Sequence, residues 1–306
     1  MAKILVIAGP TAVGKSALSI ALAKRLNGEI ISADSMQIYR GMDIGTAKAS
    51  EIEQDGVVHH LLDIRDPSEE YSCADYAADA RACIEDILSR GKTPIFCGGT
   101  GLYIKQALCD QAVSSPPGDP LLRAELELRD PNVNYQELME CDPESAAAIH
   151  PNNHRRVIRA LEIFRTSGIP KSEWDRQTPS EEYRPDAMLY YLNAPREQLY
   201  ERIDRRVDVM MEMGLYEEVR SLQLIPDSTA AQAIGYKEML GCLRGEQSVD
   251  EAADAIRLAS RRYAKRQLTW FRHQKGFTEL DVSLFANFED IVNFVAEAFE
   301  KSENMV

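Results

Sequence analysis

Short apolar runs along the first hundred residues alternate with segments whose apolar positions recur every three or four places. The apolar, β-branched runs predict buried strands at Lys3–Ala8, Glu29–Ser32, His59–Ile64 and Thr93–Cys97. Helical spacing is seen at Lys15–Leu26, at Cys73–Arg90 after the N-cap residue Ser72, and from about Leu102. Strands and helices in alternation predict a parallel sheet with helices on both faces.

A different pattern begins after residue 111. Ala112–Pro120 has the composition of a linker, and Leu121–Trp174 contains only helical segments. An apolar strand returns at Met188–Pro195 and can rejoin the sheet. Two further helices are predicted at Glu197–Met213 and at about Val249–Phe271. The acidic segment Phe277–Val306 has no function that we can assign.

Composition narrows the class of protein. The 306 residues are 44% hydrophobic and 27% charged, as in soluble globular proteins, and no apolar run is long enough to span a bilayer. The apolar start of the chain leads into a glycine loop, so it indicates a buried strand and not a signal peptide, and we expect a cytoplasmic protein. The six cysteines include no C-x-x-C pair, which argues against a zinc site.

A phosphate-binding pattern, G-x-x-x-x-G-K-[ST], lies between the first strand and the first helix. Its glycines let backbone N–H groups point inward, and these groups form an anion cradle together with the helix N-terminus. In this pattern the lysine reaches the terminal phosphate and the serine hydroxyl ligates Mg²⁺, the predicted cofactor. The predicted site comprises Gly9, Pro10, Thr11, Ala12, Val13, Gly14, Lys15 and Ser16.

The second acidic residue that P-loop NTPases usually carry is missing. The strand Thr93–Cys97 is followed by Gly98, Gly99 and Thr100, without a carboxylate. The acidic residue beside the loop is instead Asp34, which follows the second strand. Ligands of open α/β sheets bind beyond the carboxyl ends of the strands, so Asp34, Thr100 and the loop are expected to face one crevice. Asp34 is there a candidate metal ligand or general base, or simply a solvated turn residue.

These features together predict the fold class and the domains. The class is α/β, with a P-loop NTPase-like parallel sheet, helices on both faces and a small all-helical insertion domain. We predict that residues 1–111 and 186–306 form the P-loop core and that residues 112–185 form the insertion.

Basic residues are clustered although the net charge of the chain is −14. One cluster follows one side of a predicted helix, and a second lies in the insertion, so separate acidic and basic surfaces are indicated. The clusters either grip an RNA backbone or form salt bridges with the abundant acidic residues. Trp270 and Phe271 are predicted to be core residues. The first cluster comprises Arg257, Arg261, Arg262, Lys265, Arg266, Arg272 and Lys275, and the second Arg155, Arg156 and Arg159.

An ordered set of motifs resembles the tRNA dimethylallyltransferases, also called tRNA isopentenyltransferases. The resemblance covers residues 4 to 275, and its most specific parts are DSMQIYRGMDIGTAK and AKRQLTWFR. Further matching segments are GPTAVGKS, HHLLDI, GGTGLYIK, IHPNNHRRVIRALEI, RIDRRVDVMMEMGL and AIGYKEML. No C-terminal zinc-finger extension is seen, so the chain is similar to the bacterial form.

The resemblance implies a reaction. Family members move a dimethylallyl group from dimethylallyl diphosphate to the exocyclic amine of the adenine that lies 3′ of the anticodon in tRNA. The phosphate loop would then hold the leaving diphosphate, and no phosphoryl group would move, so a second acidic motif is not required. The implied partners are the anticodon stem-loop of tRNA and dimethylallyl diphosphate, with no membrane, and we expect a monomer.

The resemblance also implies roles for single residues. Asp34 matches the family's general base, and Arg206 matches an arginine that pairs with the diphosphate, with Arg202 a weaker candidate. The residues from Thr11 to Ser16 would bind the diphosphate. The family's tRNA contacts map onto Asp34, Ser35, Met36, Gln37, Thr100, Arg123, Arg155, Arg156, Val157, Ile158 and Arg159.

Two other functions fit parts of the sequence. A P-loop kinase of a small molecule explains the loop and Asp34 but leaves the basic clusters unexplained. A non-catalytic RNA-binding protein that uses a nucleotide as a switch explains the loop and the basic clusters. ATP turnover would be seen with a kinase and not with a prenyltransferase. A covalent RNA product would be seen with a prenyltransferase and not with a non-catalytic RNA-binding protein.

Overall fold

The chain divides into two compact units in the computed structural model, which describes residues 3–109, 116, 118–177, 182–226 and 228–303. One unit comprises Met1–Leu108 and Tyr183–Val306, and the other comprises Cys109–Glu182. Within the described residues, none of the helices has the length and apolar character that crossing a membrane requires.

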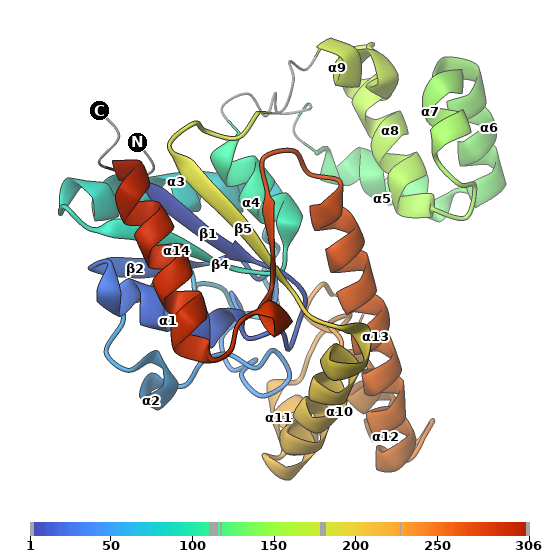
Figure 1. The fold of residues 1–306 in the computed structure, drawn as a ribbon. Helices are drawn as coiled ribbons and strands as arrows, with labels where there is room; N and C mark the ends of the chain where they lie inside the picture. The colour runs from blue at the N-terminus through green and yellow to red at the C-terminus, as the bar shows by residue number, and fades with distance from the viewer. Residues whose placement is uncertain (1–2, 110–115, 117, 178–181, 227, 304–306) are drawn as a thin grey trace. The chain divides into compact units, whose positions relative to one another are not determined.

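A six-stranded parallel sheet forms the centre of the first unit (Figure 1). Its order is β3-β2-β4-β1-β5-β6, so the predicted α/β class with a parallel sheet is confirmed. Because all strands run the same way, their carboxyl ends meet at one edge, where the phosphate loop follows β1. The strands are β1 (Ile4–Ala8), β2 (Gly28–Ser32), β3 (His59–His60), β4 (Thr93–Gly98), β5 (Ala187–Asn193) and β6 (Thr278–Asp281).

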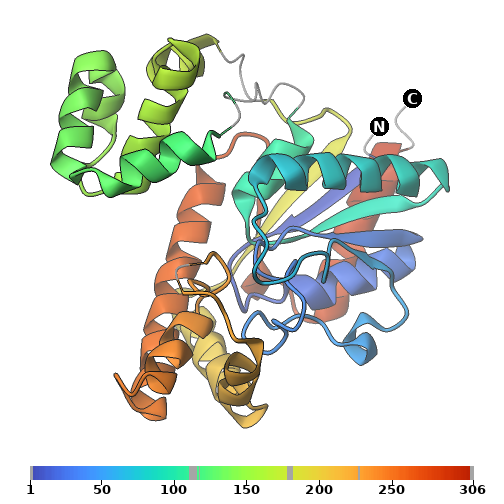
Figure 2. The same cartoon turned by 180° about the vertical axis from the view of Figure 1, so that it is seen from behind.

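Helices cover both faces of the sheet, as the alternation of side chains along β1 requires. Leu5 and Ile7 point to one face and pack in a core with α1 (Lys15–Arg25) and α14 (Phe288–Glu303). Ile4 and Val6 point to the other and pack with α3 (Cys73–Ser89) and α4 (Gly101–Leu108). Figures 1 and 2 show the two helix pairs on opposite sides of the strands.

A third apolar cluster involves four helices of the same unit. Val207, Leu215, Met239 and Ile256, one from each helix, are at most 2% exposed and pack together with residues of the segment after β2. This cluster supplies one wall of the cavity described below. The helices are α10 (Arg196–Glu212), α11 (Leu215–Leu222), α12 (Tyr236–Leu243) and α13 (Val249–Arg272).

The second unit is all-helical over its described residues. Three of its helices begin with an Asp-Pro pair, in which the aspartate caps the helix and the proline occupies the first turn. Its core includes Leu126, Leu138, Val157 and Leu161. The helices are α5 (Pro120–Leu128), α6 (Pro131–Cys141), α7 (Pro143–Ala148), α8 (His154–Ser167) and α9 (Lys171–Gln177).

The structure differs from the sequence prediction at two places. The strand predicted at His59–Ile64 ends at His60, because Leu61 and Asp63 adopt positive φ angles of 62° and 54°. The segment Phe277–Val306, for which no element was predicted, forms edge strand β6 and helix α14, and a 3₁₀ turn, Val282–Leu284, lies between them. Of the predicted linker Ala112–Pro120, residues 112–115 and 117 lie outside the described residues.

Glu29 in β2 provides a test of the fold. Its side chain is 3% exposed and accepts hydrogen bonds from Arg90 at 2.5 and 2.7 Å and from Lys92 at 2.7 Å, and it contacts His60 at 2.7 Å. The bonds from Arg90 outweigh the effect of burial and hold the pKa of Glu29 well below its usual range. We expect Glu29→Gln to lower the free energy of unfolding at pH 7 by about 1.5–3 kcal/mol, the typical value for hydrogen bonds to a charged group.

The pH dependence of this loss follows from the direction of the shift. A carboxylate with a depressed pKa stabilises the fold fully above its unfolded pKa of 4.5, and loses this contribution as the pH falls through the folded value. The difference between wild type and Glu29→Gln in urea unfolding should therefore shrink below about pH 4.5. Exposed Glu85, changed to Gln, is the control. A difference that stays constant from pH 7 to acid would contradict this role.

Candidate active site

The phosphate loop connects β1 to α1 through residues with left-handed backbone. Gly9 and Gly14 have φ angles of 138° and 105°, which L-residues with side chains rarely adopt. A Cβ on Gly9 would also lie 2.8 Å from the carbonyl oxygen of Leu192 in β5. No side chain caps the N-terminus of α1, so its first N–H groups are available to an anion.

Lys15 and Ser16 open helix α1. The Lys15 Nζ donates a hydrogen bond to the Pro10 carbonyl oxygen at 2.7 Å, across the loop. Burial lowers the pKa of Lys15 to about 8, and an anion bound in the loop would favour its charged form. Ser16 is exposed, so its hydroxyl can reach a ligand or an ion held by the loop.

Arg206 in α10 lies against this loop. Its guanidinium donates to Thr11 Oγ1 at 3.1 Å and to the Thr46 carbonyl oxygen at 3.3 Å. Burial lowers the pKa of Arg206, while the charge of Asp34 acts in the opposite direction. Arg202, one turn earlier, is exposed and reaches only the Val13 carbonyl oxygen, at 3.5 Å. Arg206 is therefore the cation of α10 that faces the interior of the site.

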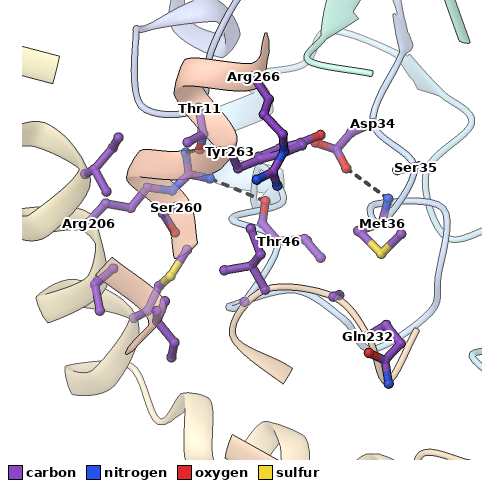
Figure 3. A pocket seen from close by; sticks show the side chains of 17 residues that line it. Thr11, Asp34, Ser35, Met36, Thr46, Arg206, Gln232, Ser260, Tyr263 and Arg266 are labelled. Carbon is purple, nitrogen blue, oxygen red and sulfur yellow. Dashed lines mark hydrogen bonds between the residues drawn. The ribbon is translucent and has the colours of Figure 1, made fainter. Parts of the chain in front are cut away.

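Asp34 follows β2 at the same edge of the sheet. Its Oδ1 accepts a hydrogen bond from the Met36 N–H at 2.9 Å (Figure 3). The Ser35 N–H donates to Thr100 Oγ1 at 3.1 Å. Gly98 at the end of β4 lets the backbone at Ala33, just before Asp34, pack close to it, since a Cβ on Gly98 would lie 2.2 Å from the Ala33 carbonyl oxygen. The structure thus brings Asp34, Thr100 and the phosphate loop together.

Gln267 in α13 was not singled out from the sequence. Its Oε1 accepts from the Thr11 N–H at 3.0 Å, and its Nε2 donates to the Gly99 carbonyl oxygen at 3.0 Å. The side chain is buried and ties the phosphate loop to the glycine turn after β4. Tyr263, one turn earlier in α13, lines the site, and burial raises the pKa of its hydroxyl to about 12.

A cavity of about 290 Å³ opens beside these groups. Figure 3 shows Arg206 next to Thr11, and Asp34 near Tyr263, around its polar part. An apolar part of the wall is formed by Ile203, Val207 and Met210 of α10, Ile256 of α13, and Ala233 and Ile234. The lining residues are Thr11, Asp34, Ser35, Met36, Gly45, Thr46, Ile203, Arg206, Val207, Met210, Gln232, Ala233, Ile234, Ile256, Ser260, Tyr263 and Arg266.

Glu218 in α11 holds the loop that forms one side of this cavity. Its carboxylate accepts three backbone N–H groups, from Asp43 at 3.0 Å, Ile44 at 2.7 Å and Gly45 at 3.1 Å. The Tyr236 hydroxyl donates a fourth hydrogen bond, at 2.5 Å. A Cβ on Gly45 would lie 2.4 Å from the Tyr236 ring, so glycine permits this close packing.

We expect Glu218→Ala to loosen this loop. Three N–H groups would lose their acceptor, which should lower the free energy of unfolding by about 1.5–3 kcal/mol, measured by urea titration. Because Thr46 follows the loop and accepts from Arg206, affinity for inorganic diphosphate should fall as well. The neighbouring Glu217 is exposed, so Glu217→Ala is the matched control. Equal effects of the two substitutions would argue against this role of Glu218.

The basic cluster on α13 serves two purposes. Arg257 forms ion pairs with Asp208 and Asp254, and Arg261 pairs with Asp204, so these two arginines form salt bridges. Arg262, Lys265 and Arg266 are exposed and line a groove with Trp270 and His273. The prediction that Phe271 is a core residue is confirmed, at 1% exposed; Trp270 is half-buried and packs against Gly101.

The basic cluster of the second unit is also divided. Arg159 and Arg123 bind Glu162, which is fully buried, at 2.6 and 2.9 Å. Burial opposes ionisation of Glu162, but hydrogen bonds from both arginines hold its pKa below the usual range. Arg155 and Arg156 are exposed on α8.

Val157 and Ile158 lie between these arginines in α8. Their side chains are 1% and 7% exposed and belong to the apolar core of the unit. They therefore pack inside the helical unit rather than facing a ligand.

Comparison with known proteins finds a family model and close relatives that agree with one another. The model of the IPP transferase family matches residues 37–274. A tRNA dimethylallyltransferase of Geobacillus thermodenitrificans is 49% identical over 313 residues, and one of Anoxybacillus flavithermus is 47% identical over 309 residues, each covering 99% of both chains.

Two solved structures are similar over the length of the chain. The tRNA isopentenylpyrophosphate transferase of Bacillus halodurans is 45% identical, with a TM-score of 0.73, and the match covers 100% of this chain and 99% of that one. A eukaryotic dimethylallyltransferase described as acting on tRNA is 33% identical, with a TM-score of 0.85, over 99% of this chain and 80% of that one.

The sheet and the glycine loop define an α/β protein of the P-loop type. The comparisons identify the family of this chain, because the family model covers more than half of the chain and the relatives match almost all of it. The chain belongs to the IPP transferase family.

Proposed function

We propose that the protein transfers a dimethylallyl group from dimethylallyl diphosphate to the exocyclic amine of the adenine 3′ of the anticodon in tRNA, and releases diphosphate. The observation that carries the proposal is one cavity with an anion cradle, a single carboxylate and an apolar wall. Thr11 and Arg206 belong to the cradle, and Asp34 is the carboxylate. The names of the relatives support the same reaction.

The reaction makes one bond and breaks one bond at C1 of the donor. The adenine nitrogen attacks C1, the C1–O bond breaks, and its electron pair leaves with the diphosphate. Asp34 accepts the proton that the amine releases, which as general base catalysis contributes about 10²–10⁴-fold. The loop from Thr11 to Ser16, with Lys15 and Arg206, stabilises the charge that develops on the leaving diphosphate.

Mg²⁺ is the proposed cofactor. Among the described residues, no three His, Cys, Asp or Glu side chains are grouped to hold a metal ion. Mg²⁺ is commonly bound by few protein groups together with substrate phosphates and water, and the exposed Ser16 hydroxyl at the start of α1 fits that mode. When bound, Mg²⁺ would neutralise part of the diphosphate charge.

RNA recognition is proposed for both units. The target adenine must leave its stack to reach Asp34, at a cost of about a few kcal/mol. Ser35, Met36 and Thr100 adjoin Asp34 and are the proposed contacts of this adenine, while Gln37, which donates to the Thr46 carbonyl oxygen at 3.2 Å, supports the loop beside them.

In the helical unit we propose that arginine side chains contact RNA phosphates. Arg155 and Arg156 are exposed, whereas Arg123 and Arg159 retain Glu162 as a partner. Val157 and Ile158 support this helix from inside.

We further propose that the enzyme acts as a monomer, and in the cytoplasm, where the tRNA substrate is found.

The test is a labelling experiment with three readouts. The protein is incubated with Mg²⁺, dimethylallyl diphosphate labelled in its carbon chain, and unmodified tRNA, and the RNA is digested to nucleosides. The proposal predicts labelled adenosine and no consumption of ATP in a parallel reaction. ATP turnover without labelled nucleoside would favour a small-molecule kinase, and tRNA binding without any product would favour a nucleotide-switched binding protein.

A further inference from the structure

We propose that Met210 and Ile256 form the floor of the cavity and limit the prenyl group it accepts to a single five-carbon unit. The inference rests on the proposed function, because it assumes an allylic diphosphate whose phosphates occupy the loop. It assigns to two apolar side chains the choice between donors that carry the same diphosphate and differ only in chain length.

The cavity has a polar end and an apolar end. Thr11, Arg206 and Asp34 stand at the polar end, where Arg206 donates to Thr11. Val207, Met210 and Ile256 contribute apolar side chains to the lining, each at most 8% exposed. Ala233 and Ile234 complete this apolar part.

Two ion pairs fix how α10 and α13 face each other. Asp204 pairs with Arg261, and Asp208 pairs with Arg257, so the two helices run antiparallel. The same register sets Arg206 and Val207 at the level of Ser260, and sets Met210 at the level of Ile256. Four residues of α-helix rise about 6 Å, so the Met210–Ile256 level lies one turn beyond Arg206.

The direction of the prenyl tail follows from the displacement. Asp34 and Arg206 both line the cavity. Because the attacking nitrogen and the leaving oxygen stand on opposite sides of C1, the reacting atoms would lie between these two side chains. The tail must leave the line of the reacting atoms sideways. Burial of apolar surface then favours the side of the cavity that Val207 and Ser260 flank and that Met210 and Ile256 close.

The floor is rigid enough to discriminate between prenyl donors of different chain length. Ile256 is 1% exposed and Met210 is 8% exposed, and both belong to the apolar cluster that α11 and α12 complete behind them. One helical turn leaves room for one branched five-carbon unit beyond the diphosphate. A second isoprene unit would overlap Met210 or Ile256, and a packed interior resists that displacement.

The experiment compares dimethylallyl diphosphate with geranyl diphosphate as donors. Wild type, Ile256→Val, Ile256→Ala and Met210→Ala are each assayed with saturating unmodified tRNA, and kcat/KM is measured for both donors. Wild type should strongly prefer the five-carbon donor. Both alanine variants should raise the geranyl-to-dimethylallyl ratio of kcat/KM by about 10-fold or more, because methylene groups in an apolar pocket are worth factors of about 10–200. Ile256→Val, which removes one methylene and is the least disruptive, should shift the ratio in the same direction.

Leu199→Ala is the matched control, since Leu199 of α10 is 1% exposed but packs in a different apolar cluster and does not line the cavity. It should leave the ratio unchanged. The inference is overturned if wild type uses both donors equally, or if the Ile256 and Met210 variants keep the wild-type ratio. A change in KM for tRNA without a change in the donor ratio would also overturn it, by assigning the apolar end to the base. Absence of dimethylallyl transfer by wild type would instead refute the proposed function.

Discussion

Changing Asp34 to Asn is expected to lower kcat for dimethylallyl transfer by about 10²–10⁴-fold, the usual contribution of a positioned general base. Asparagine keeps an oxygen at Oδ1, so the hydrogen bond from the Met36 N–H and the local turn should persist. Only the ability to accept the amine proton is removed. Single-turnover rates with saturating tRNA and donor measure the effect, and the affinity for tRNA, measured by filter binding, should change little.

The control for this substitution is Asp43→Asn in the same segment. Asp43 is exposed and pairs with Lys48 at 2.6 Å, and it does not line the cavity. Its variant should keep nearly the full rate. If Asp34→Asn transferred the prenyl group as fast as Asp43→Asn, another group would have to accept the proton.

Changing Arg206 to Gln is expected to lower kcat/KM by about 10²–10³-fold, as does removal of one fixed donor from a developing negative charge. Arg206 is the cation of α10 that lines the cavity, and it contacts the phosphate loop through Thr11 Oγ1 at 3.1 Å. Its burial removes competing water and strengthens its interaction with a bound anion. Steady-state kinetics with dimethylallyl diphosphate, together with the binding of inorganic diphosphate, measure the effect.

Arg205 offers a matched control on the same helix. It is exposed and pairs with Glu201 at 2.7 Å, one turn away. Arg205→Gln should change kcat/KM by less than about twofold, because exposed ion pairs contribute little. Similar losses for both variants would mean that the net charge of α10, and not a specific contact of Arg206, supports catalysis.

The sequence predicted best those features that depend on local patterns. The phosphate loop has a fixed spacing, and the strands of the sheet are short apolar runs, so β1, β2, β4 and β5 could be located from composition and periodicity alone. Asp34 could be found because ligands gather where strands end. Edge strand β6 carries few apolar residues, and only Leu280 in it is buried, so it gave no such signal.

Other features depend on contacts between distant segments and could not be predicted. Gln267 is 256 residues from Thr11, and Glu218 is more than 170 residues from the loop it holds. Nothing local distinguishes either side chain from an ordinary polar residue on a helix. Motif matching also selected Val157 and Ile158 with their arginine neighbours, whereas helical periodicity turns both side chains into the core of the unit.

The central claim is that the phosphate loop holds a leaving diphosphate while carbon, and not phosphorus, is attacked. The most direct test uses dimethylallyl diphosphate with oxygen-18 in the bridge between C1 and the first phosphorus. The account predicts that all of the heavy oxygen leaves in diphosphate, released in equal amount to prenylated adenosine. Heavy oxygen that stays with the five-carbon group, in dimethylallyl phosphate or the free alcohol, would show attack at phosphorus and would contradict it.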